Sequence, residues 1–317
     1  TVAFDWQHNF YLHETNTLTV GAETEKELME STYYSESAWG ITDNTFDEEN
    51  VRTNGYYVQD QVRLWNRFFT TLGVRMDDHE DFGSETTYRV APSYLVRETG
   101  TRFKGSYGTG FKAPTLYQLF SPQYGNEDLD PEESDGWDLG VEQPLLQDRL
   151  TLGATYFSND FENLIEFNGT TSTYYNVAEA ETSGIELTTS ARPTDGVTTT
   201  LSYTYTDTED KTTGKELLRR AENKVGFDVS YRFLENANVS LQTSYVGQRD
   251  DNDYSTWPAS RVELDDYFLV NLTASYQMTE NIELFGRVEN LLDEDYQEVR
   301  GYGTPGFGVF GGMQLTY

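Results

Sequence analysis

Apolar and polar positions alternate along most of this chain, in segments long enough to cross a bilayer as strands. The final residues show the pattern clearly. Successive side chains of a strand point to opposite faces, so this segment has one mostly apolar face and one small or polar face. The apolar face is formed by every second position: Phe307, Val309, Gly311, Met313, Leu315 and Tyr317. Because the alternation recurs with aromatics at segment ends, it is typical of a β-barrel with lipid outside and water inside.

About fifteen strands are expected, joined alternately by short and long connections, as in outer-membrane barrels. Expected strands include residues 56–65, 175–191 and 264–277. Short turns are predicted near residues 13–16, 66–67, 97–100, 147–148, 194–196, 235–236 and 279–280. Long loops are predicted near residues 26–54, 108–133, 168–173, 208–214, 248–260 and 293–304. The predicted fold is therefore an all-β, antiparallel transmembrane β-barrel.

The alternation also assigns each side chain to a face. The outward set is Leu72, Val74, Met76, Leu150, Leu152, Tyr156, Val225, Phe227, Val229, Tyr231, Phe268, Val270, Leu272, Tyr276, Ile282, Leu284 and Val288. The inward set includes Arg75, Asp228, Arg232, Asn271, Thr273, Glu283, Arg287 and Glu289. The inward charges are expected to pair with one another. Asp60 has the parity of the outward Val58 and Val62, so this strand is expected to be bent, bulged or near a membrane interface.

Composition agrees with a barrel that has a wet interior. Hydrophobic residues make up 36% of the 317 residues and aromatic residues 15%, and the mean hydropathy is −0.66. Few aliphatic and many aromatic residues suit aromatic girdles around a polar lumen. The net charge of −32 disfavours nucleic-acid binding, because phosphate is repelled. The chain has no cysteine, which excludes thiol chemistry and disulfides within it.

The strand count carries a topological expectation. Single-chain bacterial barrels have an even number of strands, because both termini lie on the periplasmic side. The last strand and the first strand are both expected to run toward the periplasm, which gives an odd number. We therefore expect this chain to be the C-terminal part of a larger barrel.

Several segments resemble motifs of TonB-dependent outer-membrane receptors. Residues 105–120 (GSYGTGFKAPTLYQLF) are similar to the family's Y-G-x-G-F-K-A-P segment, and residues 124–134 follow it like the family's G-N-x-x-L-x-P-E segment. Residues 175–186 resemble its Y-x-N…G-x-E strand. Residues 289–296 (ENLLDEDY) are similar to its N-L-F-D-x-x-Y turn, and Tyr317 to its terminal aromatic. The order of these segments makes the set specific.

Within the family, the resemblance is strongest to the vitamin B12 (cobalamin) receptor branch, on residues 217–221, 245–255 and 301–306. It implies a 22-stranded outer-membrane barrel with an N-terminal plug, monomeric, in contact with lipid and lipopolysaccharide, and driven by the TonB complex. The expected domain is a single partial barrel over residues 1–317, without the plug, the TonB box or the first strands. The implied function is active uptake of a large scarce nutrient, cobalamin or another corrinoid.

Candidate ligand contacts are aromatic side chains of the long loops, because rings bind the apolar faces of large ligands. They are Trp39, Tyr117, Tyr124, Tyr254, Trp257 and Tyr302. The candidate assembly signal is the terminal set Phe307, Val309, Met313, Leu315 and Tyr317. Asp250, Asp251 and Asp253 are weak calcium candidates, since carboxylates suit calcium but the spacing is not that of an EF-hand. Arg219 and Arg220 are expected to pair with neighbouring glutamates.

No catalytic motif is present, because the three histidines have no accompanying nucleophile motif. We therefore expect no enzyme activity and no cofactor, with calcium possible in the longer protein. Three other functions stay open: a ferric-siderophore receptor, a passive porin-like barrel, and a soluble secreted β-protein. A propeller would need internal repeats of blade length, and none is seen.

Overall fold

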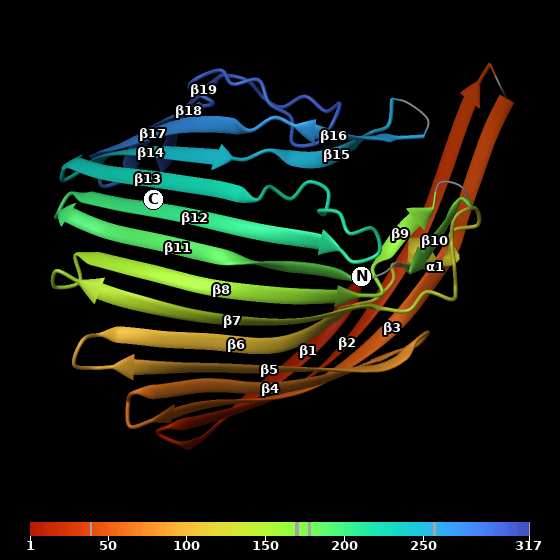
Figure 1. Cartoon of the computed structure of the whole chain (residues 1–317), viewed down its shortest axis with the longest axis horizontal. Coiled ribbons are helices and arrows are strands. Elements are labelled where there is room, and N and C mark those ends of the chain that lie inside the picture. The colour runs from red at the N-terminus through yellow and green to blue at the C-terminus, as the bar shows by residue number, and fades with distance from the viewer. Residues whose placement is uncertain (39, 169–170, 177–178, 256–257, 317) are drawn as a thin grey trace.

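The computed structural model describes residues 1–317 except 39, 169–170, 177–178, 256–257 and 317, and it leaves out the side chains of residues 42–44. Its main element is one antiparallel sheet of fifteen strands, in which each strand pairs with the next (Figure 1). The strands of this sheet are β1 Val2–His13, β2 Asn16–Ser37, β3 Gly40–Leu64, β4 Phe68–His79, β5 Gly83–Val96, β6 Thr101–Lys112, β7 Glu132–Leu145, β8 Leu150–Glu162, β11 Ala180–Thr194, β12 Val197–Asp210, β13 Asn223–Leu234, β14 Ala237–Val246, β17 Tyr267–Thr279, β18 Ile282–Glu289 and β19 Gly308–Leu315.

Three small elements lie in the long connections: helix α1 Leu116–Phe120, the hairpin of β9 Ile165–Asn168 with β10 Thr173–Asn176, and the hairpin of β15 Arg249–Asp253 with β16 Ser260–Leu264. Among the described residues, no helix has the length and apolar character to cross a membrane.

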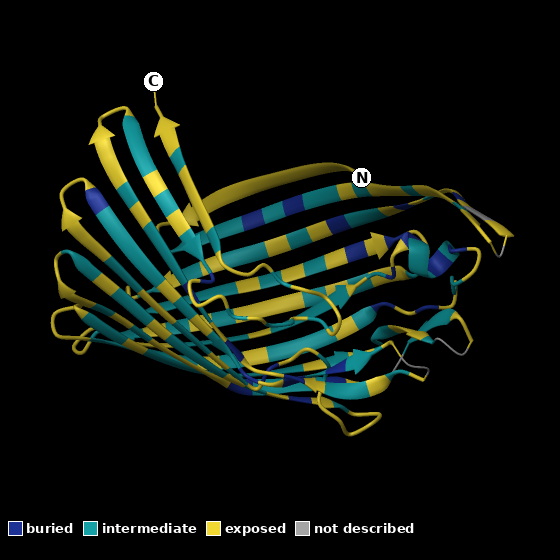
Figure 2. Ribbon diagram, turned by 90° about the horizontal axis from the view of Figure 1, so that it is seen from above, coloured by how far each residue is buried: buried dark blue, intermediate teal, exposed yellow. Residues whose placement is uncertain are grey.

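The sheet is strongly curved and has free edges at β1 and β19 (Figure 2). Its shape is that of a barrel wall that does not close on itself within the described residues. The fifteen strands confirm the predicted count and the antiparallel barrel architecture. The two edge strands run in the same direction, because an antiparallel sheet alternates direction and these strands hold its first and fifteenth places.

The connections alternate in length, as predicted. Short turns join the strands at one end, and all the small elements lie at the other end (Figure 1). Two of the short turns use left-handed backbone, with φ of 52° and 51° at Trp65 and Asn66 and of 58° and 63° at Gln147 and Asp148. Tight hairpin turns need such backbone to match the twist of their strands. In outer-membrane barrels the end with short turns faces the periplasm.

The prediction of a long loop over residues 26–54 was wrong. β2 and β3 stay paired through this segment up to the pair Ser37 and Gly40, and form an arm beyond the rest of the sheet (Figure 1). The arm contains residues that favour strands, such as Thr32, Tyr33 and Tyr34. The segment has no apolar alternation because the arm extends past the neighbouring strands, so neither face needs to be apolar.

Two other predicted strands start later than expected. Tyr175 belongs to β10 and pairs with Glu166, so the strand predicted over residues 175–191 starts only at Ala180. Leu264 closes β16, and the strand predicted from residue 264 starts at Tyr267. The loop predicted over residues 248–260 contains β15. In each case the backbone bonds within a local hairpin instead of joining the main sheet.

The predicted faces agree with the exposure of the side chains most clearly on β4, whereas on β13 and β18 the predicted inward Asp228, Arg232 and Arg287 are exposed as well. On β4, Leu72, Val74 and Met76 are exposed, whereas the alternate Arg75 is half-buried and Asp77 is buried. Directly paired outward residues also form apolar rows across strands, such as Leu139, Tyr156, Ile185 and Tyr205 on β7, β8, β11 and β12. Val270 has outward parity but is buried where the last loop meets β17.

Asp60 is accommodated without a bulge. Its pairings with Leu18 and Leu72 belong to unbroken registers on both sides of β3 at this point. Its carboxylate accepts a hydrogen bond from the Asn16 amide at 2.9 Å. Asn16 begins β2 at the end with short turns, so Asp60 lies toward that end of the wall, and neither bending nor a bulge is needed.

Candidate functional site

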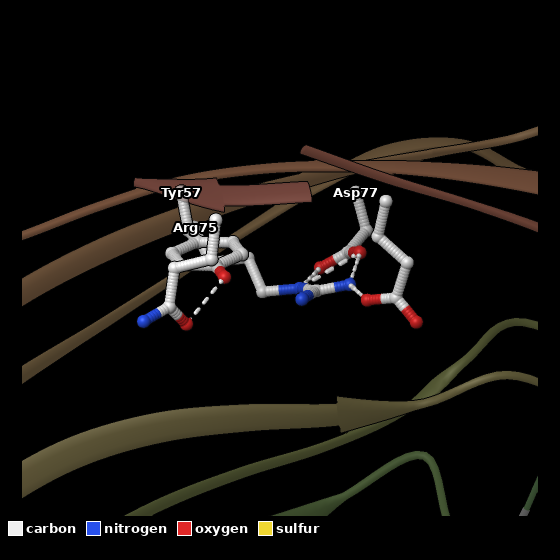
Figure 3. A network of polar contacts seen from close by, with 5 residues as sticks. Tyr57, Arg75 and Asp77 are labelled. Atoms are coloured by element: carbon white, nitrogen blue, oxygen red, sulfur yellow. Dashed lines mark hydrogen bonds and ion pairs between the residues drawn. The ribbon is translucent and has the colours of Figure 1, made fainter. Parts of the chain in front are cut away.

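The inner wall carries a polar network across the first four strands (Figure 3). The Arg75 guanidinium donates to the Asp77 carboxylate at 2.6–2.9 Å and to Glu23 at 2.9 Å. It also lies over the Tyr57 ring, 5.9 Å from the centroid, and the Tyr57 hydroxyl donates to Gln7 at 3.1 Å. Charge-assisted bonds of this kind are stronger than neutral ones. The network stiffens the wall where β1 to β4 meet.

Two glycines make room for this network. A Cβ at Gly55 would lie 2.3 Å from the Arg75 guanidinium, and one at Gly21 would lie 2.1 Å from the Tyr57 ring. Each large side chain therefore lies flat over a position without a side chain on the next strand. The flat arrangement keeps both groups against the wall.

The expected mutual pairing of the inward charges holds for one pair. Arg287 and Glu289 lie 3.0 Å apart on β18. Arg75 instead pairs with Glu23 and Asp77, and Arg232 donates to the carbonyl of Asp195 at 3.3 Å. Glu23 and Asp77 were missing from the predicted set, although the parity of their strands placed both on the inner face.

Helix α1 and the β9–β10 hairpin lie next to each other beside the arm (Figure 1), and aromatic rings from these elements form a small core. Tyr117 contacts the rings of Phe46 and Tyr174, at centroid distances of 6.2 and 6.3 Å. Tyr124 meets Phe167 edge to face at 5.5 Å. Tyr117 and Tyr124, predicted as ligand contacts, therefore pack within this core and hold α1 to the base of the arm.

Backbone geometry explains the glycine and asparagine that follow α1. A Cβ at Gly125 would lie within 2.5–2.7 Å of three backbone atoms of Leu119 and Ser121, so the turn closes only around glycine. The Asn126 amide donates to the carbonyl of Tyr174 at 3.0 Å, and Asn176 bonds the backbone of Asp130 in both directions. These residues tie the loop between β6 and β7 to the β9–β10 hairpin.

Three arginine–aspartate pairs lie where three other loops meet: the 211–222 loop, the 247–266 connection that contains β15 and β16, and the 290–307 loop. Two of the pairs join different loops, and the pair of Arg261 with Asp250 lies within the 247–266 connection. The Arg219 guanidinium donates to Asp251 at 2.8 Å, and the Arg261 guanidinium lies 2.5 Å from Asp250. Arg300 pairs with Asp253 at 3.1 Å. We call the six residues of these pairs the loop clasp. The expectation that Arg219 pairs with neighbouring glutamates was wrong, because the turn brings it to Asp251.

The three weak calcium candidates, Asp250, Asp251 and Asp253, each face a guanidinium in this clasp. Across the described part of the chain, no group of three or more carboxylate, histidine or cysteine side chains is arranged to hold a metal ion. A cation placed among these aspartates would meet three positive charges. The carboxylates act in this structure as partners of arginine.

Two exposed aromatic side chains lie next to the clasp in the chain. Tyr254 comes directly after Asp253 and is 71% exposed, and Tyr302 lies two residues after Arg300 and is 72% exposed. The Asp253–Arg300 pair therefore brings together the two segments that carry these rings. The other predicted ligand contacts, Trp39 and Trp257, lie outside the described residues.

The ENLLDEDY segment shapes the last loop. Asn290 is buried and has a left-handed backbone, with φ of 46°. Its side chain accepts from the N–H of Glu294 at 2.8 Å and donates to the Glu294 carbonyl at 2.9 Å. Tyr296 packs against Tyr267 at a centroid distance of 4.4 Å. Asparagine suits this position because it tolerates left-handed backbone while bonding the turn.

The terminal strand presents the predicted assembly signal outward. Val309, Met313 and Leu315 are exposed on one face of β19, and Phe307 is exposed just before it. The N–H of Phe307 donates to the Asp293 carboxylate at 2.8 Å, which fixes the start of the strand. Tyr317 lies outside the described residues. That these side chains act in assembly stays a prediction.

Acidification is expected to open the clasp. Hydrogen bonds from Ser255 and then from Arg300 lower the pKa of Asp253 to about 2, against an ordinary 3.8. Burial opposes ionisation of Asp251, but bonds from the N–H groups of Arg300 and Asn252 and from Arg219 outweigh it and lower its pKa. A carboxyl group whose pKa is lower in the folded state stabilises the fold at pH values above its pKa in the unfolded state. This stabilisation is lost as the pH falls through its pKa in the folded state. The loops should stay joined above about pH 4 and separate toward about pH 2.

Hydrogen exchange followed by mass spectrometry checks whether the clasp opens at low pH, with exchange rates corrected for their intrinsic pH dependence. Protection of residues 249–253 and 297–301 should fall between about pH 4 and pH 2. Residues 225–231 of β13 serve as the internal control and should keep their protection. Equal loss in both regions would contradict a role for the aspartates.

Comparison with known proteins identifies the family of this chain. The family model described as TonB dependent receptor-like, beta-barrel matches residues 1–291. The chain belongs to this TonB-dependent receptor β-barrel family. A curated member, the vitamin B12 transporter BtuB of Vibrio cholerae serotype O1, is 36% identical over 262 residues, which cover 82% of this chain and 42% of that protein. The chain therefore spans less than half the length of this relative.

Solved structures of TonB-dependent receptors share the fold. The siderophore receptor PirA from Acinetobacter baumannii superposes with a TM-score of 0.81 at 18% identity, covering 99% of this chain and 54% of that one. The ferric enterobactin receptor PfeA from Pseudomonas aeruginosa, a G324V mutant, gives 0.81 at 22% identity, covering 99% and 53%. These likenesses show the barrel fold alone. The family consists of receptors and transporters of the Gram-negative outer membrane.

Proposed function

We propose that the protein containing this chain is an outer-membrane receptor that takes up a corrinoid, using energy relayed by the TonB complex. The observation that carries the proposal is the 36% identity to a vitamin B12 transporter across 82% of this chain. The exposed apolar outer face supports a location in lipid, with lipopolysaccharide around the end that bears the long loops. The protein acts in this proposal as a receptor and not as an enzyme.

Tyr254 and Tyr302 are the proposed ligand contacts that the described structure leaves open. Both rings are exposed at the end with the long loops, which a ligand from outside the cell would reach first. A corrinoid has a broad flat ring system with apolar faces and polar amide groups at its rim. Tyrosine matches such a ligand because its ring stacks and its hydroxyl forms hydrogen bonds.

The test compares ligands on the intact protein in outer-membrane vesicles. Cyanocobalamin should bind with a Kd well below that of ferric enterobactin, and deletion of the gene should abolish cobalamin uptake. The double substitution Tyr254→Ala and Tyr302→Ala should weaken binding about fivefold to 150-fold, from the loss of two stacking contacts of about 0.5–1.5 kcal/mol each. Tyr11→Ala, an exposed tyrosine on β1, is the matched control.

Other outcomes identify the alternatives. Binding of ferric enterobactin with normal cobalamin uptake in the deletion strain would make the protein a siderophore receptor, as the solved structural neighbours are. Steady conductance of the intact protein in planar bilayers, with no ligand bound, would indicate a porin-like barrel. Solubility of the intact protein without detergent would contradict a membrane location.

A further inference from the structure

The β15–β16 hairpin lies between two loops that come from different parts of the sheet, and it bonds to both. On one side, the N–H of Arg219 donates to the carbonyl of Asp250 at 2.7 Å, and the Arg261 guanidinium donates to the carbonyl of Glu216 at 2.7 Å. On the other side, the Arg249 guanidinium donates to the carbonyl of Gln297 at 2.5 Å. Three loops are thus joined by bonds to backbone as well as by ion pairs.

Asp251 lies at the junction of the three loops. One carboxylate oxygen accepts from the Arg219 guanidinium at 2.8 Å, and the other accepts from the N–H of Arg300 at 2.7 Å. The N–H of Asn252 donates at 2.8 Å to the same oxygen that accepts from Arg219. The side chain is 0% exposed. A buried carboxylate with three donors holds its neighbours firmly, because losing any donor leaves charge without compensation.

The bonds of Asp251 affect the two segments that carry the exposed tyrosines. Tyr254 extends from the β15 side of the hairpin, and Tyr302 from the 290–307 loop that Asp251 holds through Arg300. If these loops moved independently, each ring would have to be ordered when a ligand binds. Ordering loops on binding lowers affinity, whereas loops already held in place avoid that loss.

We propose that Asp251 is a positioning residue that holds the 211–222 loop, the β15–β16 hairpin and the 290–307 loop as one preassembled unit, which presents Tyr254 and Tyr302 to the ligand. This rests on the proposed receptor function for its ligand, but the joining of the loops does not. In this arrangement the three loops move together, and closure over a ligand must come from other loops of the barrel.

The first test needs no ligand. Spin labels at Lys215→Cys and Gly303→Cys would report the distance between the two outer loops, and the chain itself has no cysteine to interfere. Both sites are exposed, and a side chain at Gly303 would meet nothing within 4 Å. The intact protein should give one narrow distance distribution. Asp251→Asn should broaden it, and Asp265→Asn, at an exposed aspartate just after β16, should not. A broad distribution before substitution, or equal behaviour of the two variants, would overturn the proposal.

The second test separates positioning from stability. Asp251→Asn should weaken cyanocobalamin binding roughly tenfold, because the loops must now be ordered on binding, while the barrel's urea midpoint stays unchanged. Arg219→Lys keeps the charge and should restore part of the affinity that Arg219→Gln loses. Weaker binding with unchanged label distances would overturn the positioning role. If no corrinoid or siderophore binds the intact protein, the receptor function fails, and the label distances still decide whether Asp251 joins the loops.

Discussion

Val74→Arg should strongly destabilise the protein in the membrane and lower its assembled fraction. Val74 is 54% exposed at the centre of the outward face of β4, between the exposed Leu72 and Met76. An arginine on the lipid face of a barrel costs about 2–4 kcal/mol at the bilayer midplane. That is a large share of the stability of an ordinary fold. The folded fraction is measured in lipid vesicles by the heat-dependent shift of the barrel on gels and by urea titration.

Thr71→Arg is the matched control for this substitution. Thr71 lies on the same strand with inward parity, so its side chain faces the polar interior, as Arg75 does two pairs further along. The same residue type is introduced three positions away on the same strand, and the loss should be below about 1 kcal/mol, as for most surface changes. Similar losses for both variants would show that the faces are wrongly assigned.

Gly184→Ala should destabilise the wall although it adds a single methyl group. A Cβ at Gly184 would lie 2.1 Å from the carbonyl oxygen of Tyr205 and 2.7 Å from the Phe157 ring. The oxygen belongs to the backbone of the paired strand, so it cannot move without opening the ladder between β11 and β12. Overpacking of this kind costs about 1–3 kcal/mol. The loss should appear as a lower urea midpoint in vesicles.

Gly73→Ala distinguishes crowding from a general effect of replacing glycine in strands. The nearest atom to a Cβ there is the Val58 carbonyl oxygen at 4.0 Å, which is an ordinary contact. Its substitution should be neutral or stabilise the protein by about 0.4–1 kcal/mol, because alanine restricts the unfolded chain. If Gly73→Ala were as harmful as Gly184→Ala, the contact with Tyr205 would not be the cause.

Much of the barrel could be predicted because strand faces follow a local rule. Parity placed Leu72, Val74 and Met76 outward and Arg75 inward, and the structure agrees. The hairpin turns could be predicted because polar residues interrupt the alternation there. The arm formed by β2 and β3 was missed because parity reveals a strand only where one face is apolar, and this ribbon extends past its neighbours.

The candidate site was predictable only in part. Tyr254 and Tyr302 were selected as loop aromatics, and the structure leaves both exposed. Tyr117 and Tyr124 were selected by the same reasoning, yet they pack in a local core with Phe46 and Phe167. A ring in a loop segment looks the same in both cases. The difference is whether another segment covers it, which the residues near it in the chain do not reveal.

Alternation and ordered motifs, read from the residues alone, were enough to establish an antiparallel barrel wall, its two faces and its receptor family. They suffice because they depend on neighbours two residues apart or within one turn. Only the folded chain decided which loops meet. Asp251 pairs with Arg219, 32 residues before it, and with the backbone of Arg300, 49 residues after it. Contacts at such separations form because the sheet brings its strand ends together, and no local pattern encodes that meeting.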